Sequence, residues 1–264
     1  MNISSAYLLV FHGSRDRQYR ATISEVGSLL SQQLCWNLTS LEYSGSRAQQ
    51  AIASKSLDKL PLVDVAALEF ADVELWEKIV SFAHTAIANK YSRLVIVPIF
   101  LSAGVHVRED IPHEIAIAKQ KLPESIAIEM LDFIGNASFT ALIEQKFAEL
   151  AIDNRVLLAH GSRLPQGNDR SERLARRVNA KIAYWAIQPD LTSTVESLAR
   201  QNQSNIAIVP YFLFSGRITK AIASLVAQLQ VRFPKNQLYL ASPLGATTEL
   251  AQVIATHITS SNEE

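Results

Sequence analysis

The chain has 264 residues, of which 48% are apolar, and its 25 basic side chains balance 25 acidic ones. That length suffices for one large domain or two small ones with a buried core, and the zero net charge removes the overall field that attracts nucleic acid or anionic membranes. The single cysteine, Cys35, excludes an internal disulfide, a zinc knuckle and an all-cysteine iron–sulfur site within one chain, and the longest apolar run, 94–101, is too short to span a bilayer.

Short apolar runs alternate with longer amphipathic ones, which is the pattern of a parallel sheet with helices on its faces. The first half predicts strands over 6–11, 63–68, 93–100 and 126–132, and helices over 17–34, 72–90, 107–121 and 137–150. The second half predicts strands over 155–160, 181–186, 205–212 and 237–241, and helices over 169–179, 189–202, 218–232 and 247–259. We therefore predict an α/β protein of two tandem flavodoxin-like domains, each a four-stranded parallel sheet flanked by helices, over 1–150 and 151–264.

Three motifs occur twice in the same order, which indicates a duplicated domain. YLLVFHGSR ending at Arg15 returns as RVLLAHGSR ending at Arg163, and LVIVPIFLSAG ending at Gly104 returns as IAIVPYFLFSG ending at Gly216; LDFIG later returns as ASPLG. The offset falls from 148 to 112 positions, so the first half carries about 36 extra residues, most of them within 36–62. This polar stretch could be a lid over a site or a solvated surface excursion.

Polar side chains follow the first three expected strands, where ligands bind in an open parallel sheet. These residues are His12, Ser14 and Arg15 after the first strand, Glu69 after the second, and His106 after the third. Two imidazoles and a carboxylate suit divalent iron, cobalt, nickel or zinc, and they could equally serve as bases. Glu69 has an alternative role, because carboxylates also gather at helix N-termini for electrostatic reasons.

The second half provides an internal comparison for these residues. It keeps a histidine, His160, in its own HGSR motif, but Ile218 matches His106, and the position matching Glu69 falls at or beside Ala186. The complete set of two histidines and a carboxylate is therefore expected only once. Arginines near both motifs, including Arg15, Arg108 and Arg163, suit a small polycarboxylate, although surface ion pairing would explain them equally well.

The HGSR element at His12, the carboxylate at Glu69 and the run PIFLSAGVHVREDIP around His106 together resemble the sirohydrochlorin chelatases of the CbiX/SirB type, within the class II chelatases. The resemblance covers roughly 6–260 and is to the long, duplicated form. It implies a lyase that inserts Fe²⁺, or Co²⁺, into sirohydrochlorin for sirohaem or cobalamin biosynthesis, with its active site in the cleft between the domains. Glu69 matches more loosely, because Val73 stands where the family has proline.

The resemblance also implies roles for individual residues. We expect His12 and His106 to receive the metal and accept pyrrole protons, and Glu69 to add negative charge or a third ligand. The expected substrate-binding residues are Ser14, Arg15, Gly104, Arg108 and Arg163. We further expect a cytoplasmic monomer, an internal pseudo-dimer, whose partners are the tetrapyrrole and the metal, with no prosthetic group and no nucleic-acid or membrane partner.

Three other functions fit parts of the pattern. A non-enzymatic carrier could deliver iron, cobalt or nickel through the same histidines. A ferrochelatase acting on another tetrapyrrole would share the architecture, but the chain has no obvious apolar segment for membrane contact. A histidine phosphatase would place arginine just before the histidine, where Phe11 and Ala159 stand.

Overall fold

The computed structural model describes residues 5–42, 61–136, 139–164, 166–201 and 205–261. Contacts divide the chain into two compact units, residues 1–137 with 246–264 and residues 138–245. Each unit holds one four-stranded parallel sheet flanked by helices. This arrangement confirms the predicted fold class.

The sheet of the first unit has the order β2-β1-β3-β4. Its strands are β1 (Ser5–Phe11), β2 (Val63–Ala67), β3 (Arg93–Pro98) and β4 (Ala127–Met130). All seven residues of β1 are buried, and its residue Val10 pairs with Ala66 of β2 on one side and Pro98 of β3 on the other. A parallel strand buried on both faces needs a continuous apolar run, which explains why β1 reads as one in the sequence.

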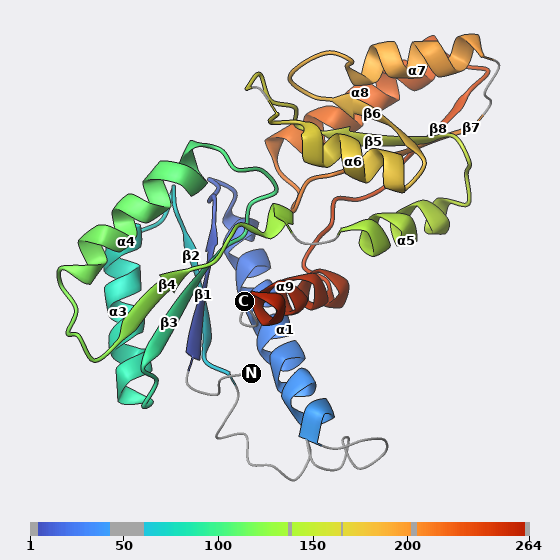
Figure 1. Ribbon diagram of the computed structural model, residues 1–264. Helices are drawn as coiled ribbons and strands as arrows, with labels where there is room; N and C mark the ends of the chain where they lie inside the picture. Colours follow the sequence, from blue (N-terminus) through green and yellow to red (C-terminus); the bar gives the residue numbers. More distant parts are fainter. Residues whose placement is uncertain (1–4, 43–60, 137–138, 165, 202–204, 262–264) are drawn as a thin grey trace. The chain divides into compact units, whose positions relative to one another are not determined.

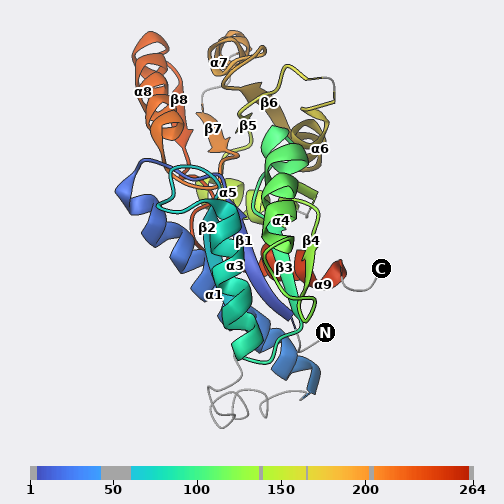
Figure 2. The same ribbon diagram turned by 90° about the vertical axis from the view of Figure 1, so that its left-hand side faces the viewer.

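Helices cover both faces of this sheet (Figure 1). They are α1 (Arg17–Glu42), α3 (Leu75–Ala88), α4 (Ile111–Lys119) and α9 (Thr248–Ser260). Helices α3 and α4 pack on the face that holds Leu8, with Ile79 and Ile115 in the same core cluster. Helices α1 and α9 lie together against the opposite face (Figure 2).

The second unit repeats this plan with the order β6-β5-β7-β8. Its strands are β5 (Arg155–Ala159), β6 (Ala180–Tyr184), β7 (Asn205–Pro210) and β8 (Gln237–Leu240). Its helices are α5 (Thr140–Leu150), α6 (Asp169–Arg177), α7 (Leu191–Arg200) and α8 (Arg217–Arg232). Val195 of α7 and Val226 of α8 share a core cluster with Leu158 of the sheet, while α5 and α6 pack on the other face.

The compact units differ from the expected division after residue 150, because the final helix of each half of the sequence belongs to the other unit. Helix α5 belongs to the second unit, where Glu144 accepts from Arg155 across 2.8 Å. Helix α9 belongs to the first unit, where His257 Nε2 donates to the carbonyl oxygen of Asp132 across 2.8 Å. The boundary at 150 therefore marks a sequence repeat, whereas the packed units exchange their final helices.

Two helices differ in extent or type from the sequence prediction. Helix α1 was expected over 17–34 but continues to Glu42, so the beginning of the expected insertion is helical. The remainder of that insertion over 43–60, with the suggested lid, lies outside the described residues. The helix expected over 107–121 begins as a π-helix, His106–Asp110, before α4. Among the described helices, none combines the length and the apolar character needed to cross a bilayer.

Candidate metal site

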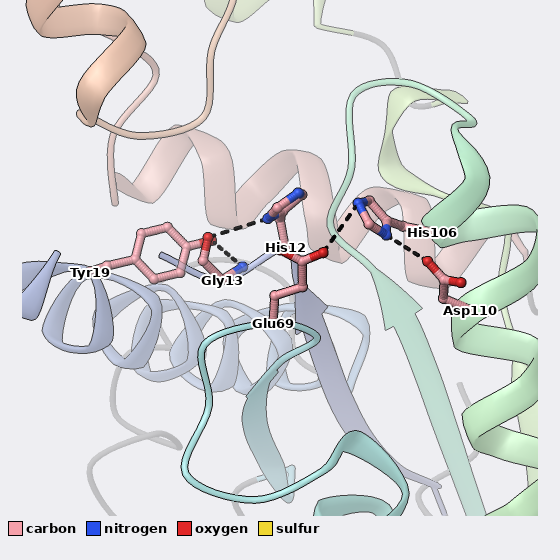
Figure 3. Close-up of polar contacts among 6 residues, drawn as sticks. All are labelled: His12, Gly13, Tyr19, Glu69, His106 and Asp110. Carbon is pink, nitrogen blue, oxygen red and sulfur yellow. Dashed lines mark hydrogen bonds and ion pairs between the residues drawn. The ribbon is translucent and has the colours of Figure 1, made fainter. Parts of the chain in front are cut away.

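Three neighbouring strand ends bring two histidines and a glutamate together (Figure 3). His12 directly follows β1, Glu69 lies two residues beyond β2, and His106 begins the π-helix after β3. The order β2-β1-β3 makes these strands adjacent, and the carboxyl ends of parallel strands meet at one edge of the sheet. All three residues belong to the first unit, and their expected place in a cleft between domains stays a prediction.

The three side chains form an open cluster. One possible ligand atom from each lies within 4.8 Å of the others. The two imidazole rings meet edge to face with centroids 4.7 Å apart, and His106 Nε2 lies 3.9 Å from Glu69 Oε1. Ligand atoms bound tetrahedrally at about 2.1 Å would be roughly 3.4 Å apart, so a small inward movement would complete the set. Such spacing suits a metal that is held transiently better than a closed structural site.

The backbone beneath the cluster joins two of its members. The amide of Glu69 donates to the carbonyl oxygen of His12 across 2.9 Å. Between them Gly13 has φ of +104°, and a Cβ atom there would lie 1.9 Å from the Glu69 carbonyl oxygen. The glycine of the first HGSR motif is thus required for the close approach of the two loops.

Two aromatic side chains support the cluster and its first loop. The ring centroid of Phe100 lies 6.3 Å from that of His12 and 6.2 Å from that of His106. The hydroxyl of Tyr19 accepts from the amide of Gly13 across 3.4 Å. Burial raises the pKa of Tyr19 to about 12, opposed by that hydrogen bond. Tyr19 therefore keeps its proton at neutral pH and supports the loop instead of acting as a base.

His106 has a second carboxylate neighbour that the sequence reasoning missed. Asp110 Oδ2 lies 2.7 Å from Nδ1 of His106, on the opposite edge of the ring from Glu69. The spacing gave a signal, because residues four apart on a helix face one another, but the expected helix over 107–121 left out His106. The contact gives His106 a carboxylate at each ring nitrogen.

Two of the expected substrate-binding residues serve the first loop. The hydroxyl of Ser14 accepts from the amide of Asp16 across 3.1 Å, so it stabilises the turn into α1. The guanidinium carbon of Arg15 lies 4.9 Å from the ring centroid of Phe70, in a cation–π contact. Phe70 itself was not expected at the site, and it is 48% exposed with φ of +56°.

The other expected substrate-binding residues are more dispersed. The carbonyl oxygen of Gly104 accepts from the amide of Arg108 across 3.2 Å, which fixes the start of the π-helix. The side chain of Arg108 is exposed, as is Val105 beside His106. Arg163 is exposed in the second unit, in the HGSR motif that follows β5.

The second unit preserves the backbone pattern without the ligands. The amide of Ala186 donates to the carbonyl oxygen of His160 across 2.9 Å, just as Glu69 does to His12. This equivalence confirms that Ala186 takes the place of the carboxylate. Ile218, which matches His106 in the sequence repeat, packs against the core of the second unit. Within the described parts of the chain, the only group of three metal-ligating side chains is the one in the first unit.

Comparisons with known proteins agree with the repeat. The sequence model of the CbiX family matches residues 6–150 and again residues 154–261. A sirohydrochlorin ferrochelatase from Priestia megaterium is 24% identical over 226 residues, which cover 79% of this chain and 82% of that protein. A sirohydrochlorin cobaltochelatase from the same organism is 23% identical over 209 residues, covering 73% of this chain and 67% of that protein.

A solved structure shares the fold across nearly the whole chain. SirB from Bacillus subtilis with Fe³⁺ superposes with a TM-score of 0.72 at 19% sequence identity. The superposition covers 97% of this chain and 95% of that chain. The likeness therefore includes both four-stranded sheets, not one half alone.

Proposed function

The chain belongs to the CbiX family, and we propose that it inserts a divalent metal ion into sirohydrochlorin, with Fe²⁺ preferred over Co²⁺. The observation that carries this proposal is the cluster of His12, Glu69 and His106 at one edge of the first sheet. Two relatives of the chain are named for this reaction, one with iron and one with cobalt. The reaction belongs to sirohaem biosynthesis with iron and to cobalamin biosynthesis with cobalt.

The cluster supplies what the metal requires before it enters the macrocycle. A hydrated divalent ion must exchange water for protein ligands and then for pyrrole nitrogens, so the protein must bind it weakly enough to release it. His12, Glu69 and His106 provide two imidazoles and one carboxylate, which suit first-row divalent ions. The open spacing and the exposure of His12 favour such reversible binding.

The same side chains can balance the protons of the reaction. Insertion of one divalent ion releases two pyrrole protons, so the net charge of the macrocycle core does not change. A histidine that gives up the metal regains its lone pair and can accept one proton, and Glu69 can accept the other. Ligand exchange and proton transfer then use one small set of atoms.

The surface beside the cluster suits a flat tetrapyrrole with peripheral carboxylates. Phe70 and Val105 are exposed by 48% and 55%, and they flank Glu69 and His106 in the sequence. Arg15, stacked on Phe70, can bind a carboxylate, and so can the exposed Arg108. We assign Ser14 and Gly104 to shaping this surface through their backbone contacts.

The oligomeric state, location and cofactors are properties of the whole molecule. We propose that the chain acts as a monomer, because the duplication supplies both halves within one polypeptide. We also propose that it acts in the cytoplasm. The metal is a substrate, and no prosthetic group is proposed, since a single cysteine cannot ligate an iron–sulfur cluster by itself. Arg163 is proposed to bind substrate from the second unit.

The test is anaerobic spectrophotometry of the purified chain with sirohydrochlorin and either Fe²⁺ or Co²⁺. We expect catalysed loss of the metal-free spectrum, and a fall in kcat/KM of about 100-fold or more for His12→Ala or His106→Ala. His84→Ala is the matched control, because His84 is exposed on α3, outside the cluster. Its rate should equal that of the unaltered chain.

Three results would overturn the proposal. If the chain binds metal through His12 and His106 but does not accelerate insertion of either ion, it is a metal carrier. If insertion proceeds equally in both histidine variants, the reaction takes place elsewhere on the chain. A higher rate with another metal-free tetrapyrrole than with sirohydrochlorin would assign a different chelatase substrate.

A further inference from the structure

The imidazole of His106 lies between two carboxylates, one at each ring nitrogen. Nδ1 is 2.7 Å from Asp110 Oδ2, whereas Nε2 is 3.9 Å from Glu69 Oε1. Both Asp110 and Glu69 are more exposed than the histidine, with side-chain exposures of 44% and 41% against 30%. Because Glu69 belongs to the metal cluster, the short contact with Asp110 lies on the side of the ring that faces away from that cluster.

The chemistry of the short contact determines where the proton of a neutral His106 resides. An ionised carboxylate can only accept hydrogen bonds, so a separation of 2.7 Å requires Nδ1 to carry the hydrogen. The lone pair then lies on Nε2, the nitrogen that faces Glu69. Carboxylates that accept from the second nitrogen of a metal-binding histidine fix its orientation and increase its basicity.

His12 has no comparable support. Its Nδ1 lies 3.4 Å from the carbonyl oxygen of Gly13, at the long limit of a hydrogen bond. No ion pair joins its ring to a carboxylate in the described part of the chain, and its side chain is exposed. The two histidines of the cluster therefore differ: His106 has a carboxylate oxygen close to Nδ1, whereas His12 has only a long contact with a backbone carbonyl.

The local backbone and the sequence repeat both point to His106 and Asp110 as a functional pair. They are the first and last residues of the π-helix, a widened turn that occurs frequently at functional sites. At the offset of 112 positions, the second half has Ile218 in place of His106 and Ile222 in place of Asp110. There the corresponding stretch is the regular helix α8. Both polar residues and the π-helix are absent together from the described second unit.

We propose that Asp110 is a positioning residue that holds His106 in the tautomer with its lone pair on Nε2. His106 is then the anchoring ligand for the incoming metal ion, and His12 is the exchangeable ligand. This division of roles rests on the proposed function of the cluster. It suits the release of the metal to a macrocycle, because one ligand can leave while the other still holds the ion.

The first test is titration of the apo chain with Co²⁺ alone, followed by visible absorption and calorimetry. Asp110→Ala should weaken Co²⁺ affinity by about 10- to 100-fold. Asp110→Asn should weaken it less, because the amide oxygen still accepts from Nδ1. Glu109→Ala is the matched control, since Glu109 is an exposed carboxylate of the same π-helix, and it should change affinity less than twofold.

Double variants separate positioning from general structural damage. In a His106→Ala background, the additional change Asp110→Ala should have less than a twofold effect. In a His12→Ala background, it should keep its full effect. His106→Ala should also lose more Co²⁺ affinity than His12→Ala. Equal losses in both backgrounds, or a greater loss for His12→Ala, would overturn the proposal.

Long-range ¹H–¹⁵N NMR of the histidine side chains tests the tautomer directly. At a pH where the rings are neutral, His106 should be protonated at Nδ1, and its signal is identified by its absence in His106→Ala. In Asp110→Ala the hydrogen should move to Nε2, the tautomer preferred by a free histidine side chain. An Nε2–H tautomer in the unaltered chain contradicts the proposal.

These results are independent of catalysis. A chain that binds Co²⁺ with the expected dependence on Asp110, yet leaves sirohydrochlorin unchanged, would refute the proposed reaction and preserve the role of Asp110. A chain that inserts metal normally but binds Co²⁺ equally well without Asp110 would refute the role of Asp110 and preserve the proposed reaction.

Discussion

Glu69 donates its backbone amide to the carbonyl oxygen of His12 across 2.9 Å, so two members of the metal cluster are joined through the main chain. The same bond recurs between Ala186 and His160 in the second unit. It is therefore a property of the repeated fold and does not depend on the carboxylate. The sheet fixes the spacing between the ends of β1 and β2. Whether a metal can bind there depends on the side chains that follow these strands.

Gly13→Ala should disturb this relationship directly. A Cβ atom would meet the Glu69 carbonyl oxygen at 1.9 Å, and φ of +104° is unfavourable for any residue with a side chain. We expect the free energy of unfolding to fall by about 2 kcal/mol or more, and Co²⁺ affinity to fall as the loops separate. Urea denaturation and Co²⁺ titration measure the two effects.

Gly104→Ala is the control for that substitution. Apart from Gly104 itself and its two neighbours in the chain, no residue has an atom within 4 Å of a Cβ built there. Its stability should match that of the unaltered chain to within about 0.5 kcal/mol. Equal stability losses in the two variants would mean that the contact with Glu69 is not what requires glycine at position 13.

The cluster could be predicted from the sequence because each member lies in the loop that follows an apolar run. Parallel strands place their carboxyl ends at one edge, so His12, Glu69 and His106 needed only the correct strand order to meet. Asp110 and Phe70 were harder to place. The spacing of four positions between His106 and Asp110 was visible, but the π-helix that holds them has no sequence pattern of its own. The exposure of Phe70 depends on a left-handed backbone, which has none either.

The exchange of final helices could not be predicted for a different reason. Both halves have the same series of strands and helices, so the repeat alone assigns α5 to the first sheet and α9 to the second. Specific contacts decide otherwise, such as that of Glu144 with Arg155 and that of His257 with Asp132. The two residues of each pair are not related by the period of a helix or a strand, so the sequence pattern does not reveal their contact.

Phe70→Ala tests whether the exposed ring contacts the proposed tetrapyrrole. We expect KM for sirohydrochlorin to rise about 5- to 30-fold, the effect of losing one aromatic contact of 1 to 2 kcal/mol, while Co²⁺ affinity stays unchanged. Phe70→Gly should give the same kinetic result without a loss of stability, because glycine tolerates φ of +56°.

The matched control for Phe70 is Val231→Ala, which removes an apolar side chain that is 82% exposed on α8. Its KM should not change. An unchanged KM in Phe70→Ala would place the macrocycle away from this side chain, and a change in Co²⁺ affinity would assign Phe70 to the metal cluster.

Tyr19→Phe should remove a loss of stability that the unaltered chain suffers in alkali. Burial raises the pKa of Tyr19 to about 12 in the folded chain, whereas the unfolded value is near 10. The unfolded chain therefore loses this proton first, and the associated stability is complete below pH 10 and lost as pH rises through 12. At pH 11 the unaltered chain should have lost about 1.4 kcal/mol that Tyr19→Phe does not lose.

Urea denaturation of both proteins at pH 8 and pH 11 measures this difference. Burial also raises the pKa of Tyr211, so some alkaline loss should persist in Tyr19→Phe. Parallel losses in the two proteins between these pH values would contradict the burial of the Tyr19 hydroxyl.

His257→Ala tests whether α9 stabilises the first unit. His257 is 9% exposed, and its Nε2 donates to the carbonyl oxygen of Asp132 beyond β4. Loss of this hydrogen bond and of the buried ring should lower the free energy of unfolding by about 1 to 3 kcal/mol. The exposed His84→Ala should cost less than about 0.5 kcal/mol.

Hydrogen exchange shows where the effect of His257→Ala is located. Because α9 packs beside α1, amide protection should fall in α1 and in α9 itself. Protection in β5 and β7 of the second unit should stay as it was, since α9 belongs to the other compact unit. A loss confined to the second unit would mean that α9 completes the sheet of its own sequence repeat, as an unexchanged duplication requires.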